Sequence, residues 1–531
     1  MSIVSSVAFV PRGFAAEFPK TYELDEAEYE RINNISKLKL EDARAQLENP
    51  ENEQEKSENS AGAQDQTASS GAEVQTAEEM DDELKEYKLD NYDDEEEEEE
   101  DDSLAMFSNI KGVQYHENGE NDPYVTMNTQ EEEEMEREEM QIYPTDNLLL
   151  AARTEDNLSH VEVYIYESQE ENLYVHHDFL LPSFPLCLEW LDYKVGTSDD
   201  TPGNYVAVGT FDTEIEIWNL DVVDAVYPAA VLGANAANSG SNKKKKKAPK
   251  VNPKTHTDAI LALSSNRNAH NLLASGSADT SIKLWNLSSC TCVKSFTYHT
   301  DKVSSLSWHP KMPSVLLSGS YDKTARIADL RADAPPLTLT IDSDVENVAW
   351  DPHNENNFFV GSDAGILYYC DARDMSKPVW QLQAHDGPIS CLSVNPNVPS
   401  FVATGSTDRM VKLWNTSDHT PKLIVSRDLD VGRVFTCSFV PDESISFHLA
   451  ASGSKGLVRV WDTATNSGVR RAFESRIGKK SVAPKERVVQ LEDAGANDES
   501  DEEDEEDDEY EDIEANEDDD SADEIQDQEM A

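Results

Sequence analysis

Short stretches of alternating apolar and polar residues recur along most of this chain, separated by turns rich in glycine, serine and aspartate. Such stretches are typical of half-buried β-strands, and regular spacing between them predicts an all-β fold. In three segments a histidine precedes an aspartate by 23 residues, and a tryptophan position follows the aspartate by 6 residues. These segments contain His256, Asp279 and Trp285; His299, Asp322 and Ala328; and His385, Asp408 and Trp414. The spacing fits one four-stranded blade of a β-propeller.

Each blade is predicted to contain a buried chain of hydrogen bonds that braces its strands. The aspartate lies in the turn between the second and third strands, the histidine precedes the first strand, and a Ser or Thr on the second strand bridges histidine and tryptophan. We therefore assign these histidines a structural rather than a catalytic role. The predicted bracing residues are His256, Ser275, Asp279, Trp285, His299, Ser318, Asp322, His385, Thr404, Asp408, Trp414, Trp218 and Trp461.

Weaker units complete a predicted seven-bladed WD40 β-propeller over residues 144–475, but the first blade lacks an innermost strand next to its second strand. Residues 4–11 (VSSVAFVP) are similar to residues 303–310 (VSSLSWHP) of a later blade. Residues 4–11 are thus predicted to supply the missing strand, which makes residues 15–143 an insertion within blade one. Chance similarity in an eight-residue window is the alternative. The last strand of the ring is expected at residues 468–473.

The charge of the chain is concentrated in two segments. The net charge is −63, from 107 acidic and 44 basic residues. Residues 15–143 hold 42 acidic and 10 basic residues, and residues 491–531 hold 24 acidic residues and no basic one. Such segments bury too little apolar surface to offset chain entropy, so we expect an acidic disordered insertion and an acidic disordered tail. They should repel nucleic-acid phosphates and attract basic proteins. Apolar islands at residues 84–92 and 122–125 are interpreted as short docking motifs, with an uninvolved spacer as the alternative.

Two basic segments stand out against this acidity. Residues 234–255 are predicted to form a flexible loop, a candidate nuclear-targeting signal or RNA contact, although a merely solvated loop is an alternative. Its candidate residues are Lys243, Lys244, Lys245, Lys246 and Lys247. Residues 476–490 form a second basic segment before the tail. In the tail, Ser500 and Ser521 are followed by acidic residues and are candidate phosphorylation sites.

No motif in the sequence points to catalysis, a cofactor or a metal. A phosphate-binding glycine loop, a His-Glu-x-x-His motif and a nucleophile elbow are all missing from it. The six cysteines lack zinc-site spacing and are interpreted as buried thiols in a reducing compartment. The adjacent His176 and His177 lie in a predicted strand, where they are expected on opposite faces and unable to share a site. No apolar stretch approaches the roughly 18 residues of a membrane span. We expect a non-enzymatic protein without cofactor, small-molecule substrate or membrane partner.

Stretches outside the repeats resemble the periodic tryptophan protein 1 family, and the resemblance covers almost the whole chain. The stretches are residues 10–14, 82–87, 143–156, 184–193, 209–218 and 426–432. The resemblance implies a scaffold of the nucleus and nucleolus that acts in ribosomal RNA processing and in assembly of the large (60S) ribosomal subunit. It also implies the pre-60S particle, ribosomal RNA, ribosomal proteins and other assembly factors as partners. The alternatives are an acidic chromatin-associated histone-binding WD40 protein and a substrate adaptor of a ubiquitin ligase.

Overall fold

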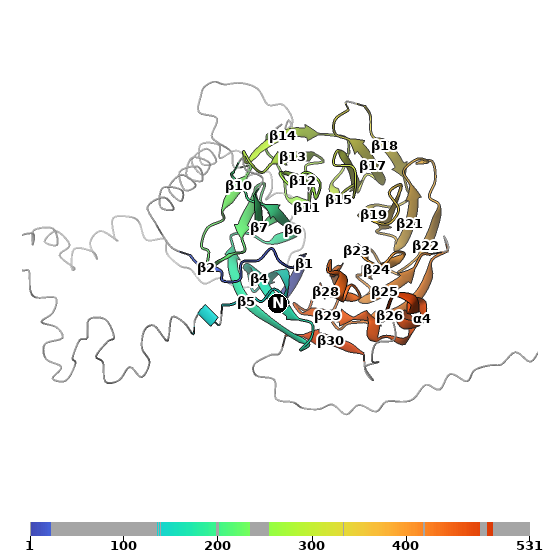
Figure 1. The fold of residues 1–531 in the computed structure, drawn as a ribbon. Coiled ribbons are helices and arrows are strands. Elements are labelled where there is room, and N and C mark those ends of the chain that lie inside the picture. Colours follow the sequence, from blue (N-terminus) through green and yellow to red (C-terminus); the bar gives the residue numbers. More distant parts are fainter. Residues whose placement is uncertain are drawn as a thin grey trace, which may run out of the picture. The chain divides into compact units, whose positions relative to one another are not determined.

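The described residues form a ring of seven four-stranded antiparallel sheets (Figure 1). The seven-bladed propeller predicted from the sequence is confirmed. All of these residues belong to one unit, Met1–Leu491. The computed structural model describes residues 2–22, 135–197 apart from 136 and 139, 201–233, 254–332, 334–417, 420–477 and 486–491.

The blades are numbered along the ring, and each is given from its innermost to its outermost strand. Blade one consists of β1 (Ser2–Val10), β3 (Asn147–Glu155), β4 (Leu158–Glu167) and β5 (Asn172–Leu181). Blade two consists of β6 (Pro185–Tyr193), β7 (Pro202–Thr210), β8 (Ile215–Asn219) and β10 (Ala230–Leu232). Blade three consists of β11 (Ile260–Ser265), β12 (Leu272–Ser277), β13 (Ile282–Asn286) and β14 (Thr291–Phe296). Blade four consists of β15 (Val303–Trp308), β16 (Val315–Ser320), β17 (Thr324–Asp329) and β18 (Leu337–Thr340).

The last three blades follow the same plan. Blade five consists of β19 (Val345–Trp350), β20 (Asn357–Ser362), β21 (Ile366–Asp371) and β22 (Trp380–Gln383). Blade six consists of β23 (Ile389–Val394), β24 (Phe401–Ser406), β25 (Met410–Asn415) and β26 (Lys422–Asp428). Blade seven consists of β27 (Val434–Phe439), β28 (His448–Gly453), β29 (Val458–Asp462) and β30 (Arg487–Gln490). None of the helices in the described part of the chain has the length and hydropathy needed to cross a membrane.

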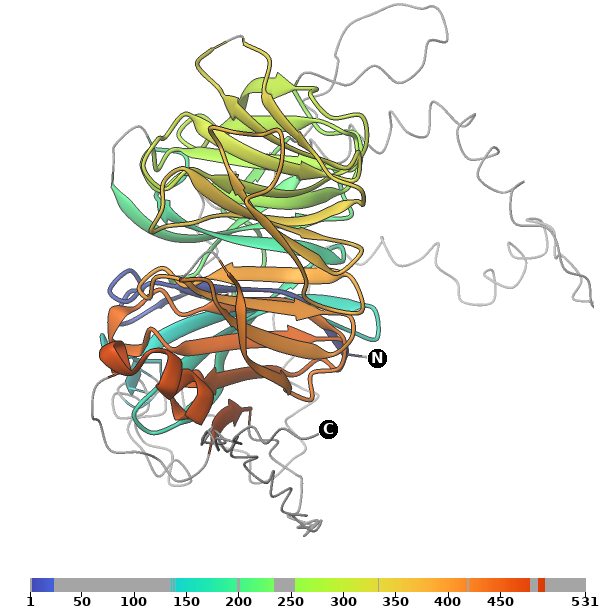
Figure 2. The same cartoon turned by 90° about the vertical axis from the view of Figure 1, so that its right-hand side faces the viewer.

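Blade one is built from two distant parts of the chain. Strand β1 pairs antiparallel with β3, from Ser2 opposite Glu155 to Val10 opposite Leu148. The strand predicted at residues 4–11 therefore lies innermost in blade one, and the residues between β1 and β3 are an insertion within that blade. Val4 and Val7 are buried in one apolar cluster with residues of blade seven. Strand β1 lies between β6 of blade two and β27 of blade seven and buries apolar side chains against them. It is therefore the element that closes the ring (Figure 2).

The prediction that residues 468–473 form the last strand is wrong, because residues 467–472 form a helix. The helix α4 spans Ser467–Ala472, and the Asn466 side chain caps it by accepting from two backbone amides at its start. Val469 and Phe473 are four residues apart, which places both on one helical face, and both are buried in the apolar cluster that joins blades six and seven. A second short helix, α5 (Glu474–Ile477), and two 3-10 turns, η4 (Glu443–Ile445) and η5 (Thr463–Thr465), lie in the connections of blade seven. Strand β30 pairs instead with β29 and completes the blade.

The ring has two ends that differ in what leaves them. Val10 and Asn147 lie at one end, here named the insertion face, because residues between them depart there. A two-stranded parallel pairing of β2 (Lys20–Thr21) with β9 (Val222–Val223) fixes the start of that departing segment to blade two. The opposite end, named the bracing face, carries the turns between second and third strands. Strands β10 and β30 both end at the bracing face, which is therefore where residues 234–253 and the tail begin.

Candidate functional site

The bracing chain of blade three is fully formed. The Trp285 Nε1 donates to Ser275 Oγ (2.8 Å), which lies 2.6 Å from His256 Nε2, and His256 Nδ1 lies 3.0 Å from Asp279 Oδ2. A carboxylate only accepts, so Nδ1 carries the proton, and the neutral Nε2 accepts from the Ser275 hydroxyl. Burial lowers the pKa of His256 despite the opposing carboxylate. The ring is therefore neutral and fully hydrogen-bonded, which is a structural arrangement.

Blades four and six repeat this chain with one substitution each, Ala328 for the tryptophan in blade four and Thr404 for the serine in blade six. In blade six, His385 Nδ1 lies 2.9 Å from Asp408, its Nε2 lies 2.8 Å from Thr404 Oγ1, and Trp414 Nε1 donates to Thr404 over 2.8 Å. In blade four, the chain runs from Asp322 through His299 (2.9 Å) to Ser318 (2.8 Å) and lacks the indole, because Ala328 occupies the tryptophan position.

Trp218 and Trp461 do not join such a chain, contrary to the sequence prediction. Trp218 Nε1 donates to Glu216 (3.2 Å), and Trp461 Nε1 is buried without a hydrogen-bond partner among the described residues. The strand register explains the difference. Val208 and Ala451 occupy the position that Thr404 holds in blade six, and neither side chain offers a hydroxyl. Both indoles are instead packed in apolar clusters between neighbouring blades, outside any bracing chain.

The two adjacent histidines of blade one lie together rather than on opposite faces. The register of β4 and β5 shifts at this point, with His177 opposite Val163 and Val175 opposite Tyr164, so His176 is the extra residue of a β-bulge. His176 Nδ1 lies 2.7 Å from His177 Nδ1, and His176 Nε2 lies 3.1 Å from the Met140 carbonyl oxygen. Since that oxygen only accepts, His176 donates through Nε2 and accepts from His177 at Nδ1. This pair anchors the returning end of the insertion.

A cavity lies on the insertion face where the innermost strands of neighbouring blades end. This cavity, here named the mouth cavity, is the best candidate for binding a partner. It has a volume of about 460 Å³ and is lined by blades one, two and seven, together with Arg267 of blade three. The Trp190 Nε1 donates to Asn204 (2.9 Å), which fixes the indole. The Arg267 guanidinium covers its face at 4.6 Å, and the Phe14 ring meets it edge-on at 4.8 Å. Phe14 is partly exposed, so this arrangement offers an aromatic surface beside Arg267, whose charge is paired with Glu189 and Asp192.

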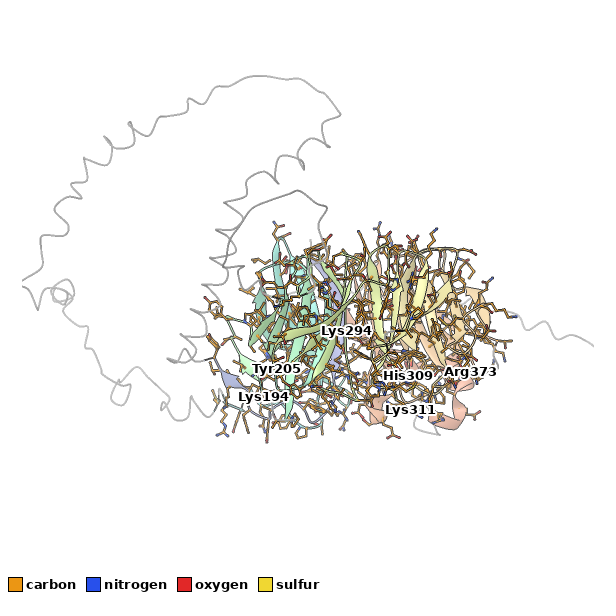
Figure 3. The ribbon with its side chains drawn as sticks, turned by 90° about the horizontal axis from the view of Figure 1, so that it is seen from above. Lys194, Tyr205, Lys294, His309, Lys311 and Arg373 are labelled. Atoms are coloured by element: carbon orange, nitrogen blue, oxygen red, sulfur yellow. The ribbon has the colours of Figure 1, made fainter. Side chains whose placement is uncertain are left out.

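Charged residues of both signs lie on the insertion face. Lys194, His309, Lys311 and Arg373 all lie at this same end of the ring (Figure 3). Two of these residues pair with carboxylates, Lys311 with Glu355 and Arg373 with Asp371 (2.6 Å). The insertion face therefore carries charges of both signs rather than a single basic patch. No group of three or more His, Cys, Asp and Glu residues able to hold a metal occurs among the described residues.

Sequence reasoning missed Phe14 and Arg267 as site residues. Each contacts Trp190, because β6 packs between β1 of blade one and β11 of blade three, so no local spacing signals that the two residues share one site. The candidate residues Lys243, Lys244, Lys245, Lys246 and Lys247 and the candidate phosphorylation sites Ser500 and Ser521 lie outside the described residues, as do the predicted docking motifs at 84–92 and 122–125.

Comparisons with known proteins agree with this architecture. The family described as WD domain, G-beta repeat matches residues 249–286, 290–329 and 376–415, which contain the three bracing chains. An uncharacterized WD repeat-containing protein of Schizosaccharomyces pombe is 71% identical over 94% of this chain and 96% of its own length. Periodic tryptophan protein 1 of Saccharomyces cerevisiae is 38% identical over 92% of this chain and 93% of its own length. Its Drosophila melanogaster homolog is 31% identical, with 89% and 96% covered. The chain therefore belongs to the periodic tryptophan protein 1 family.

Proposed function

We propose that this chain is a non-enzymatic scaffold of the nucleolus that serves assembly of the large ribosomal subunit and processing of its RNA. The observation that carries the proposal is the placement of charged segments on a rigid ring. The acidic insertion begins at the insertion face, between two strands of blade one. The basic loop that contains Lys243 to Lys247 begins at the bracing face. Acidic segments attract basic ribosomal proteins, and lysines attract RNA phosphates, so one molecule offers both kinds of contact.

The ring itself supports a binding role. A propeller holds its end loops rigidly and displays them to partners. The mouth cavity, with Phe14 and Arg267 exposed beside Trp190, adds an anchor point next to the start of the insertion. In His256, His299 and His385, both ring nitrogens are engaged in bracing hydrogen bonds, which leaves none for proton transfer to a substrate. The ring therefore provides a binding surface and holds its loops in position. The expected partners are the large-subunit precursor particle, its RNA and its proteins.

Sedimentation of cell extracts tests this proposal. The protein should migrate with large-subunit precursors, and RNase treatment should release it from them. Migration with nucleosomes, unchanged by RNase, would instead identify a histone-binding protein and contradict the proposal. Replacing Lys243 to Lys247 with alanine should weaken nucleolar retention, while replacing the same number of glutamates at residues 131–134 and 136 serves as a control of equal size.

A further inference from the structure

Two cysteines face each other across the seam between blades six and seven. Cys391 lies on β23 and Cys437 on β27, the innermost strands of adjacent blades, and their sulfur atoms are 2.9 Å apart. Both residues are buried, with exposed fractions of 5% and 6%. The thiols of Cys187, Cys290 and Cys292 lie instead against backbone carbonyl oxygens. The blade six and seven seam thus brings two thiols into direct contact.

Neighbouring hydrogen bonds hold the two strands at this separation. The Ser390 hydroxyl donates to the Val434 carbonyl oxygen on one side of the pair, and the Phe439 amide donates to Ser393 Oγ (3.1 Å) on the other. A side chain at Gly405 would place its Cβ 2.6 Å from the Cys391 sulfur, so glycine leaves room for the thiol. The contact is therefore fixed by backbone positions rather than by a chance rotamer.

We propose that Cys391 and Cys437 are a modification site that forms a reversible disulfide between blades six and seven on reaction with a small disulfide such as oxidised glutathione. One cysteine thiolate attacks a glutathione sulfur, forming a mixed disulfide and releasing a glutathione thiolate that takes up the lost proton. The second cysteine thiolate then displaces the remaining glutathione, which is protonated in turn. Two protein thiols are oxidised, and one glutathione disulfide is reduced to two thiols.

The bond would join blade six, which has a complete bracing chain, to blade seven, which has none. In blade seven, Lys455 occupies the position of the bracing aspartate and pairs with Asp430, while Trp461 Nε1 has no hydrogen-bond partner among the described residues. A covalent link from β23 to β27 would restrict opening of this blade. Burial raises the pKa of the Cys391 thiol, so oxidation should be slow at neutral pH and accelerate as pH rises. This inference does not rest on the proposed function.

Mass spectrometry on the reduced full-length chain tests the proposal. Folded protein, and protein refolded from denaturant, are incubated in glutathione redox buffers and quenched with acid. The quenched protein is then unfolded in denaturant at neutral pH, where every free thiol is accessible, treated with a maleimide and digested. A peptide pair linked through Cys391 and Cys437 is expected, at least in the refolded sample, with both residues protected from the maleimide. Backbone amides of β28 and β29 should then exchange hydrogen about tenfold more slowly in the oxidised protein.

Matched variants complete the test. Cys187 occupies the same register position in blade two that Cys391 occupies in blade six, opposite Gly209 rather than Gly405. C187S should leave the linked peptide unchanged, whereas C437S should abolish it and leave Cys391 open to the maleimide. A linked peptide missing from both folded and refolded samples would overturn the proposal. So would a stable glutathione adduct on Cys391 in the presence of Cys437.

Discussion

Thr404 is the residue on which the bracing chain of blade six depends, because its hydroxyl donates to His385 and accepts from Trp414. Thr404→Val preserves shape but leaves two buried nitrogen atoms unpaired. Each such group costs about 1–3 kcal/mol, so we expect the free energy of unfolding in urea to fall by about 2–6 kcal/mol. Ser452→Ala is the matched control, since the Ser452 hydroxyl is buried without a partner among the described residues. Equal losses in the two variants would contradict the bracing role.

The stability that His177 contributes to the fold should depend on pH. Burial lowers its pKa to about 4, whereas the unfolded chain protonates near pH 6.5. As pH falls, the unfolded state binds the proton first, so the stability that neutral His177 contributes is complete above about pH 6.5 and is lost toward about pH 4. The NMR signals of its ring, assigned with a His177→Gln variant, should keep their neutral positions at about pH 5.5. A titration midpoint near 6.5 would show that the ring is not buried as described.

At the scale of elements, β1 determines whether the ring closes. Removing residues 2–10 would expose the edge of β3 and the apolar residues of blade seven that β1 covers, among them Val440 and Ala450. We expect the truncated chain to lose its cooperative thermal transition and to aggregate. A synthetic peptide of residues 2–11, added during refolding, should restore the transition by pairing with β3, whereas a scrambled peptide should not. A truncated chain that melts like the full chain would show that β1 is dispensable.

The elements also show how far sequence reasoning reaches. The bracing pairs could be predicted because both partners of each pair lie in one blade, 23 residues apart, and β1 could be found because innermost strands share a residue pattern. The last strand could not be predicted, because the helix at this position depends on the Asn466 cap and on burial of Val469 and Phe473 against blades six and seven. The His176 bulge and the mouth cavity depend on strand register and ring closure, which no single segment encodes.

For the whole molecule, stability and charge reside in separate parts of the chain. The seven sheets bury the core, and Val10 and Leu148 are already paired on either side of the insertion. Replacing residues 23–134 with a short glycine-serine linker therefore keeps every blade intact. The melting temperature should change by no more than about 2 °C, because closing a long loop costs little more than closing a short one.

The same variant should lose much of its affinity for basic proteins, because residues 23–134 carry 38 of the 107 acidic residues. Binding to polylysine, measured for both chains at low and high salt, separates this effect from folding. At about 1 M salt the screening length falls to about 3 Å, so the difference between the two chains should largely disappear. A difference that persists at high salt would mean that the insertion binds through apolar contacts. A deletion that unfolds the ring would mean that charge and stability are not separable in this chain.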